Sequence, residues 1–297
     1  MSYGIVHGYN YECGGIGDLF RSLVSFHAIC KESGIPLYVS FAKIPYFQQC
    51  FTCHAPPFHP VETLRHVAGH DGNAFIEAIV RSCEDGKKTV YLECNSGFLH
   101  APSRLLSQLP SFSSLLRPSD DVEAHIRAHG LVAGCYYSVH VRCGDTFMRA
   151  ECGGRGNVSY DKRTDANHDR LVYFDRLIQD CATRNGFDRT KPIVLHSDSA
   201  EFKHGLRALN PAYVVLETEI QHVANRYGKN TSDSFLSTVA EFYILTRSCG
   251  IIMPIYSGFS HMAAFLGQTE LFCSATPSEA WHDEMLASFP PRIKTPL

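Results

Sequence analysis

Short apolar runs alternate along the chain with longer stretches in which apolar residues recur every three or four positions. The short runs are rich in β-branched residues and show little alternation of apolar and polar positions, which is typical of parallel strands covered on both faces. The longer stretches have the period of amphipathic helices. This pattern predicts an α/β protein built largely of parallel sheets.

The elements fall into two series. The first series has strands over 4–7, 37–41 and 89–94 and a helix over 74–83. Another helix follows the first strand and is closed by Gly34 and Pro36. A last helix begins at a capping box of Asp120 and Glu123 and ends at 129–130. The second series has strands over 136–142, 193–197, 213–217 and 251–255, and helices over 168–184, 199–209, 232–247 and 260–266. The change of series predicts two domains, 1–132 and 133–297.

Composition narrows the class of protein. The chain has 297 residues, of which 44% are hydrophobic, enough for one or two buried cores. Twenty-seven basic and thirty acidic residues give a formal charge of −3, which argues against a chain-wide basic surface for nucleic acid. No run reaches about 18 apolar residues, and the N-terminus lacks a signal-peptide pattern. We therefore expect a soluble cytoplasmic protein without a membrane span, whose twelve cysteines are mostly reduced and buried.

Two glycines stand between the first strand and the first helix. Gly15 and Gly17 lie in the glycine-rich turn 13–18. Glycine lets the backbone approach a ligand closely, and the following helix start presents N–H groups. The turn is a candidate ligand loop, although a tight connection needed only for packing also explains it. It is not a dinucleotide-binding fingerprint, because Phe20 occupies the third glycine position.

A histidine, an arginine and an aspartate mark the end of the strand predicted over 136–142. His140 and Arg142 alternate with apolar residues, and Asp145 follows Gly144. Ligands of α/β sheets bind beyond the carboxyl ends of strands, and arginine can grip a phosphate with two hydrogen bonds. The pattern indicates an anion site. An Arg142–Asp145 ion pair beside a hydrogen-bonded core histidine is the alternative.

A turn of serine and glycine precedes the helix predicted over 260–266. Ser257, Gly258 and Ser260 bring two hydroxyl groups and several main-chain N–H groups toward one point. Such a helix start suits a phosphate. An ordinary serine cap without a ligand is the alternative.

Two further sites are weaker candidates. Asp198 follows the strand over 193–197, where its carboxylate could accept hydrogen bonds from a sugar or ribose hydroxyl, or could cap the next helix. Cys50, Cys53 and His54 match the C-x-x-C-H pattern of haem attachment. Because the sequence has no second paired-cysteine motif, we expect free thiols there and no metal site.

Three of these segments together resemble the fucosyltransferase superfamily, which includes the α-1,2- and α-1,6-fucosyltransferases and the protein O-fucosyltransferases. The segments are 15–20, 140–145 and 257–267. They occur in the family's order and spacing, and the H-x-R-x-G-D element at 140–145 is the most specific. The resemblance covers nearly the whole chain in outline.

This resemblance implies a GT-B fold, in which two Rossmann-like domains face a cleft. It places the acceptor mainly against residues 1–132 and the nucleotide-sugar donor against residues 133–297. It further implies an inverting, metal-independent glycosyltransferase that needs no cofactor. Its donor would be GDP-fucose and its acceptor a glycan or glycoprotein.

Residue roles follow from the same resemblance. Arg142 would bind the β-phosphate, His140 would help place the nucleotide, and Glu241 is nearest to an acidic residue that relatives place by the base or ribose. The full set of candidate donor-binding residues is Gly15, Gly17, His140, Arg142, Asp198, Glu241, Ser257, Gly258 and Ser260. Asp145 and Glu151 are the two candidates for the catalytic base.

One departure from the family keeps other functions open. Some relatives carry a second basic residue where this chain has Cys143. A transferase that uses another sugar nucleotide, such as a UDP-pentose, therefore remains an alternative. A non-catalytic protein that binds nucleotides or glycans is another.

Overall fold

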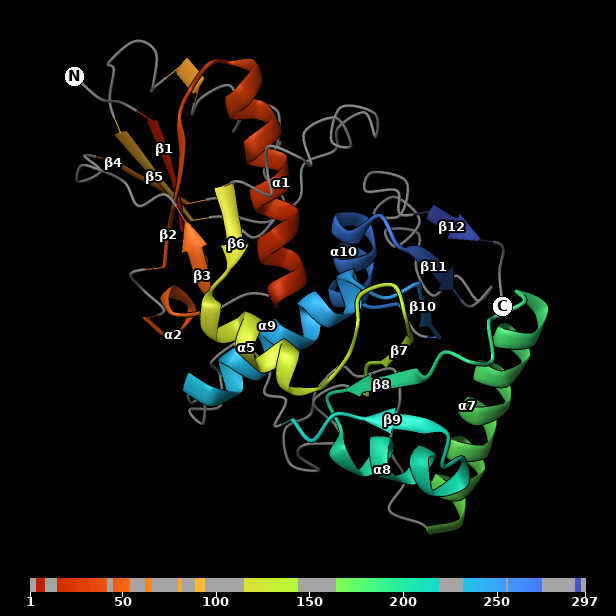
Figure 1. Ribbon diagram of the computed structural model, residues 1–297. Coiled ribbons are helices and arrows are strands. Elements are labelled where there is room, and N and C mark those ends of the chain that lie inside the picture. The colour runs from red at the N-terminus through yellow and green to blue at the C-terminus, as the bar shows by residue number, and fades with distance from the viewer. Residues whose placement is uncertain are drawn as a thin grey trace. The chain divides into compact units, whose positions relative to one another are not determined.

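The computed structural model describes residues 4–8, 15–41, 45–53, 62–65, 80–81, 89–93, 115–143, 164–218, 232–254, 256–273 and 292–294 (Figure 1). Contacts divide the chain into two compact units. Unit 1 contains Met1–Ala124, Val223–Val239 and Ala287–Phe289, and unit 2 contains His125–His222, Ala240–Leu286 and Pro290–Leu297. Each unit draws on separate stretches of the chain, and a division at residue 132 stays a prediction.

Unit 1 is built around a parallel sheet of four strands. Their order is β2 (Leu37–Ser40), β1 (Gly4–Gly8), β5 (Thr89–Glu93) and β4 (Glu62–Arg65). An antiparallel pair, β3 (Phe51–Cys53) and β6 (Leu116–Pro118), and the short helix α2 (Pro45–Gln48) complete the described elements of the sheet region.

Helix α1 (Ile16–Glu32) follows β1 in sequence and contributes much of the core of unit 1. Leu19, Phe20 and Leu23 recur at helical spacing and are buried. The helix ends because Gly34 takes a left-handed conformation, with φ of 66°, and Ile35 N–H then donates to the Cys30 carbonyl at 2.9 Å. The predicted stop at Gly34 is confirmed.

Unit 2 contains a parallel sheet of six strands, in the spatial order β12, β11, β10, β7, β8, β9. Numbered by their order within this sheet, the strands run 6-5-4-1-2-3, which is the Rossmann arrangement. Their bounds are β7 (Tyr137–Val141), β8 (Ile193–Ser197), β9 (Tyr213–Val215), β10 (Gly250–Met253), β11 (Glu270–Cys273) and β12 (Arg292–Lys294).

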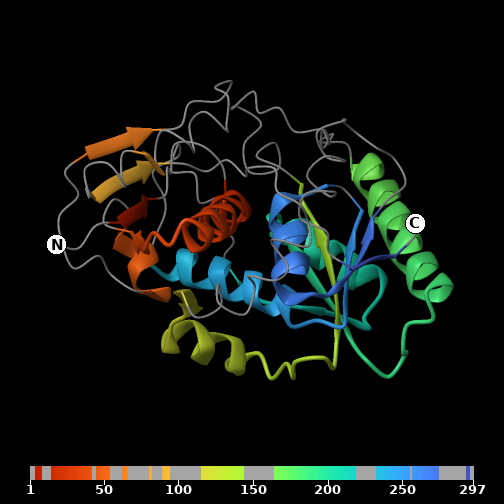
Figure 2. The same ribbon diagram turned by 90° about the horizontal axis from the view of Figure 1, so that it is seen from above.

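Helices cover both faces of this sheet. Figures 1 and 2 show α7 (Thr164–Arg184) and α10 (Gly258–Gly267) on opposite sides of it. A core cluster joins Val139, Val141 and Leu195 of the sheet to side chains of α7 and α8 (Ala200–Leu209). On the other face, Tyr136 donates to the Ile244 carbonyl of α9 (Ser232–Thr246) at 2.6 Å. The predicted α/β class with largely parallel sheets is confirmed.

Several element bounds differ from the sequence predictions. Helix α5 (Asp120–Ala128) is capped by Ser119, whose hydroxyl accepts the Val122 N–H at 3.3 Å, so the predicted cap at Asp120 is one residue late. Helix α7 begins at Thr164, four residues before the predicted start. The strands β3, β4, β6, β11 and β12 are only three or four residues long and were not predicted from the pattern. Most of the helix predicted over 74–83 lies outside the described residues.

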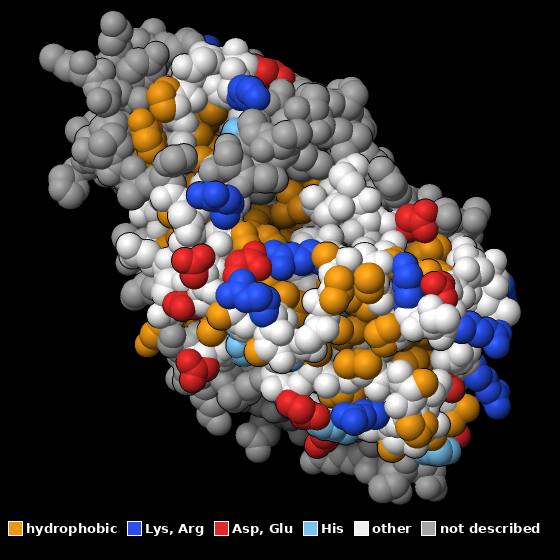
Figure 3. Space-filling view, in the orientation of Figure 1, with side chains coloured by type: hydrophobic (Ala, Val, Ile, Leu, Met, Phe, Trp, Pro, Cys, Tyr) orange, Lys and Arg blue, Asp and Glu red, His pale blue; other side chains and the backbone are white. Residues whose placement is uncertain are grey.

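The distribution of charged side chains on the surface agrees with the small net charge of the chain. On the face drawn in Figure 3, acidic and basic side chains of the described residues are interspersed. None of the described helices combines the length and the apolar content that crossing a bilayer requires.

Candidate functional site

The strand order of unit 2 reverses between β7 and β10, which are neighbours in the sheet. In open parallel sheets of this kind, ligands bind outside the carboxyl ends of the strands at such a reversal. The residues that leave these two strands are Arg142 after β7 and Ser257 before α10. The fold therefore brings two of the candidate segments to one edge of one sheet.

The N-terminus of α10 is an open helix start. Ser257 occupies the cap position and its carbonyl accepts the His261 N–H at 2.9 Å. Its hydroxyl, however, is buried and makes no hydrogen bond, and the first turn of α10 holds no acidic residue. The first N–H groups of a helix have no intrahelical acceptor and carry the positive end of its dipole. Together these groups form a site that suits an anion.

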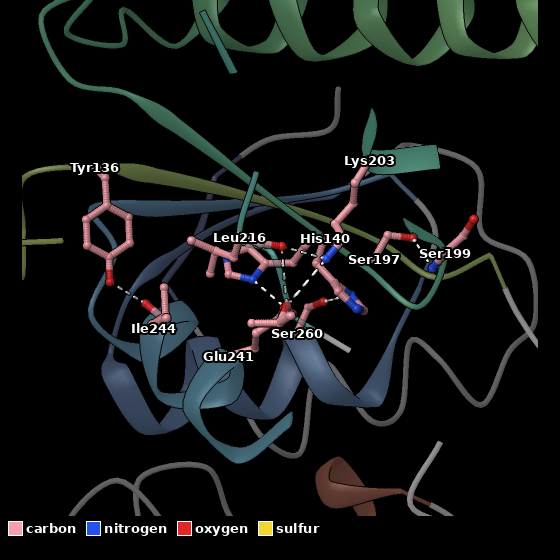
Figure 4. A network of polar contacts seen from close by, with 11 residues as sticks. Tyr136, His140, Ser197, Ser199, Lys203, Leu216, Glu241, Ile244 and Ser260 are labelled. Atoms are coloured by element: carbon pink, nitrogen blue, oxygen red, sulfur yellow. Dashed lines mark hydrogen bonds and ion pairs between the residues drawn. The ribbon is translucent and has the colours of Figure 1, made fainter. Parts of the chain in front are cut away.

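Ser260, one turn into α10, is committed to a protein partner. Its hydroxyl lies 2.6 Å from Nδ1 of His140, as Figure 4 shows. His140 is only 7% exposed, and burial, followed by the nearby His196 and Arg142, lowers its pKa to about 3 against the opposing effect of Glu241. The histidine is therefore neutral near pH 7, a fixed polar group that adds no charge.

Arg142 is the first residue beyond β7 and is half-buried. In the next strand, the residue at the same level is Asp198, because the β7–β8 ladder ends with the pair Val141 and Ser197. Asp198 Oδ1 accepts the N–H of Cys143 at 2.7 Å. The interpretation of Asp198 as a helix cap is wrong, since Ser199 caps α8 by accepting the Phe202 N–H at 3.2 Å.

Cys143, which stands where some relatives have a basic residue, is a buried thiol. It is 3% exposed and belongs to the core cluster behind β7. Burial, and then the charge of Asp198, raises its pKa to about 12 although a hydrogen bond with Ser197 opposes the change. The thiol therefore stays protonated, and Cys143 adds no charge at this strand end.

Glu241 lies inside a buried polar network (Figure 4). Its Oε2 is 3.3 Å from His196 Nδ1, its Oε1 is 3.9 Å from Lys203 Nζ, and Oε1 also accepts from Thr218. Lys203 donates to the Leu216 carbonyl at 3.0 Å. Burial alone would raise the pKa of Glu241, but these neighbours outweigh it and lower the pKa. The carboxylate is ionised and held among protein partners.

His196 and Lys203 also belong to this buried network, although no motif of the sequence marks them as site residues. Alternation along the strand places His196 on the face of Val194, which follows from β spacing. Lys203 gives no such signal, because it sits beside the apolar Phe202 in α8 and its buried state depends on partners from other elements.

Gly15 lies in unit 1 at the cap position of α1. Its N–H donates to Asp18 Oδ2 at 2.8 Å, and Asp18 also contacts Arg21. A methyl group at Gly15 would meet no atom within 4 Å, and its φ of −111° is open to any residue. Within the described residues, local structure therefore does not require glycine at this position. Gly17 is buried in the first turn of α1.

The remaining candidate residues add little to the description of the site. Asp145 and Glu151 lie outside the described residues. Cys50 is buried, its Sγ is 3.3 Å from the Tyr46 carbonyl, and burial, followed by the charge of Asp121, raises its pKa to about 12. Cys53 is half-buried and also a free thiol. Within the part of the chain that the structure describes, no three His, Cys, Asp or Glu side chains are grouped to hold a metal ion.

A parallel sheet in this strand order, with an open helix start at its reversal point, gives unit 2 a Rossmann-type α/β fold. Solved structures give a closer comparison. NodZ α-1,6-fucosyltransferase co-crystallised with GDP matches with a TM-score of 0.52 and 15% identity, over 90% of this chain and 93% of that chain. A variant of Arabidopsis thaliana FUT1 in complex with GDP matches with a TM-score of 0.57 and 11% identity, over 94% of this chain and 72% of that chain.

Fucosyltransferase NodZ from Bradyrhizobium gives a similar match, with a TM-score of 0.51 and 15% identity over 90% of this chain and 94% of that chain. No family model and no curated protein sequence matches this chain. The chain thus shares the fold of these fucosyltransferases, and the predicted GT-B fold class is confirmed.

Proposed function

We propose that this protein is an inverting, metal-independent glycosyltransferase that transfers fucose from GDP-fucose to a hydroxyl group of a glycan. The observation that carries the proposal is the open start of α10 at the reversal point of the unit 2 sheet, where β7 also ends and Arg142 follows it. The shared fold with fucosyltransferases solved in complex with GDP supports the choice of donor.

The proposed reaction is a single displacement at the anomeric carbon. An acceptor hydroxyl attacks from the face opposite the nucleotide, the bond to the β-phosphate breaks, and negative charge grows on the departing diphosphate. Arg142, the Ser257 hydroxyl and the N–H groups of α10 are fixed donors for that charge. Fixed donors do not have to reorganise during the step, so they lower the barrier more than water would.

The buried groups around this site position it. His140 holds Ser260 in the first turn of α10, and the two residues connect the strand end to the helix start. Glu241, which we place near the base or ribose of the donor, is buried and anchored by His196 and Lys203, so it would support this part of the site from behind. In this proposal the proton of the acceptor goes to Asp145 or Glu151.

Two measurements test the function. Calorimetry with GDP, UDP and ADP identifies the nucleotide, and we expect GDP to bind most tightly. Incubation of the protein with GDP-fucose and a glycan array, with and without a chelator, then tests transfer and its metal independence. Preferential binding of UDP would instead support a donor other than GDP-fucose. The sequence allows this alternative, because Cys143 stands where some relatives have a basic residue. Nucleotide binding without transfer to any acceptor or to water would support a non-catalytic binding protein.

A further inference from the structure

Two consecutive residues at the end of β8, Ser197 and Asp198, hold the chain where it leaves β7. The main-chain ladder between these strands ends at Val141 and Ser197. Beyond it, Asp198 Oδ1 accepts the Cys143 N–H at 2.7 Å, and Ser197 Oγ lies 3.3 Å from Cys143 Sγ. The N–H of Ser199 donates to the same Ser197 hydroxyl at 3.2 Å, an arrangement visible in Figure 4.

Arg142 stands between the two fixed points. On one side Val141 is held in the ladder, and on the other side Cys143 is held through both its amide and its buried thiol. A hydrogen bond from an amide to a carboxylate is charge-assisted and stronger than one between neutral groups. The carboxylate of Asp198 therefore sets the direction of the backbone from which the guanidinium extends.

We propose that Asp198 is a positioning residue, which acts through the Cys143 amide to aim Arg142 at the β-phosphate of a nucleoside diphosphate. The proposal rests on the proposed function, and it differs from the sequence prediction in which Asp198 binds a ribose hydroxyl. A ribose contact would act on every guanine nucleotide. A residue that aims Arg142 at the β-phosphate would act on GDP and leave GMP, which has no β-phosphate, unaffected.

The test compares two substitutions at this position with a neighbouring control. Asp198→Ala removes the acceptor, whereas Asp198→Asn keeps an oxygen that can accept the Cys143 N–H. Ser199→Ala removes the cap of α8 but leaves the main-chain bond to Ser197 in place. It therefore controls for loss of stability in the same turn. Calorimetry with GDP and with GMP is carried out on all four proteins.

We expect Asp198→Ala to weaken GDP binding by about tenfold, which corresponds to ~1.4 kcal/mol. GMP affinity should stay within about twofold, and Asp198→Asn should recover most of the GDP affinity. Ser199→Ala should lower the melting temperature without changing either affinity. Equal losses for GDP and GMP, or equal losses for the Ala and Asn variants, would overturn the positioning role.

Failure of the proposed function has a different signature. A wild-type protein that binds neither nucleotide would remove the phosphate role together with that function. Hydrogen exchange then still tests the contact itself: the Cys143 amide should be protected in the wild type and in Asp198→Asn, and exchange faster in Asp198→Ala. Equal exchange in all three proteins would contradict the contact between Asp198 and the Cys143 amide.

Discussion

Helices α1 and α10 each follow a parallel strand in the sequence, yet their first turns differ. In α1 the third helical residue is Asp18, whose carboxylate accepts the Gly15 N–H and closes the helix start. In α10 the third helical residue is Ser260, which turns to His140, and the cap hydroxyl of Ser257 has no partner. A carboxylate in the first turn satisfies the N–H groups and opposes the helix dipole. The comparison teaches that α10, not α1, is built to receive an anion.

The largest expected effect concerns Arg142, the cation that follows β7. Arg142→Ala should reduce the rate of GDP release from GDP-fucose by about 10²–10³-fold, because charge on the leaving diphosphate then loses a fixed donor. The substitution should leave the circular dichroism spectrum unchanged. The rate of the Arg142→Lys variant should fall between the rates of wild type and Arg142→Ala, since lysine keeps the positive charge but not the planar guanidinium group. Activity within about tenfold of wild type in the Ala variant would contradict the role of Arg142.

The contact that holds α10 to β7 should make stability depend on pH. His140 has a pKa of about 3 in the folded protein against 6.5 for an ordinary histidine, so the unfolded chain binds more protons between these values. Its contribution is therefore complete above pH 6.5 and falls as pH decreases, by up to about 1.4 kcal/mol per unit. The lowered pKa of Glu241 adds a loss in the same direction below about 4.5.

Denaturant unfolding between pH 7 and 5 measures this dependence. His140→Asn should be less stable than wild type at pH 7, yet its stability should fall less steeply with acid. His129 provides a comparison with His140 for this dependence on pH. Burial, followed by the charge of His125, also lowers the pKa of His129, which lies at the start of neither helix. An unchanged slope in His140→Asn would show that the histidine is already protonated or accessible in the folded state.

A smaller effect is expected from the cap of α10. Ser257→Ala should weaken GDP binding by about tenfold, the contribution of one hydrogen bond to a charged group. The same variant should not lower the melting temperature, because it removes a buried hydroxyl that has no partner. Calorimetry and thermal unfolding of one preparation test both statements. A loss of stability without a loss of affinity would mean that Ser257 is an ordinary structural cap.

The smallest effect belongs to α1 and should show the opposite behaviour. Asp18→Asn weakens the cap of α1 and should cost about 1 kcal/mol of stability, measured by urea unfolding. GDP affinity should stay within about twofold. A gain in GDP affinity would sharpen the comparison further, since it would mean that Asp18 repels the nucleotide from α1.

The sequence predicts those parts of the fold whose signals are local. Strand β8 has the predicted bounds, because three consecutive apolar residues, Ile193–Leu195, begin it and the polar Ser197 and Asp198 mark its end. Strands β11 and β12 escape prediction, because so few residues are strands only through pairing with neighbours. Likewise the serine turn before α10 can be recognised from its residues, whereas the contact between Lys203 and Glu241 cannot, because the fold brings two distant helices together.

The candidate site divides in the same way. Arg142 and Ser257 follow from motifs at strand ends, which the chain order alone reveals. The Ser260 hydroxyl has a hydrogen-bond partner and the Ser257 hydroxyl does not, because of where His140 lies. Only the packed structure shows this difference. Cys143 shows the limit of sequence-based prediction most clearly. The sequence identifies a thiol, but only its burial in the structure shows that the thiol stays protonated.

The interleaved path of the chain has a consequence for biosynthesis. Unit 1 takes in Val223–Val239 and Ala287–Phe289, and unit 2 is completed by Pro290–Leu297. Neither unit has all of its residues until the ribosome has made nearly the whole chain. Both units should therefore complete their folding late in synthesis. An expression fragment that ends at Ala124 would lack the segments Val223–Val239 and Ala287–Phe289 of unit 1, although the remainder would keep all of unit 2.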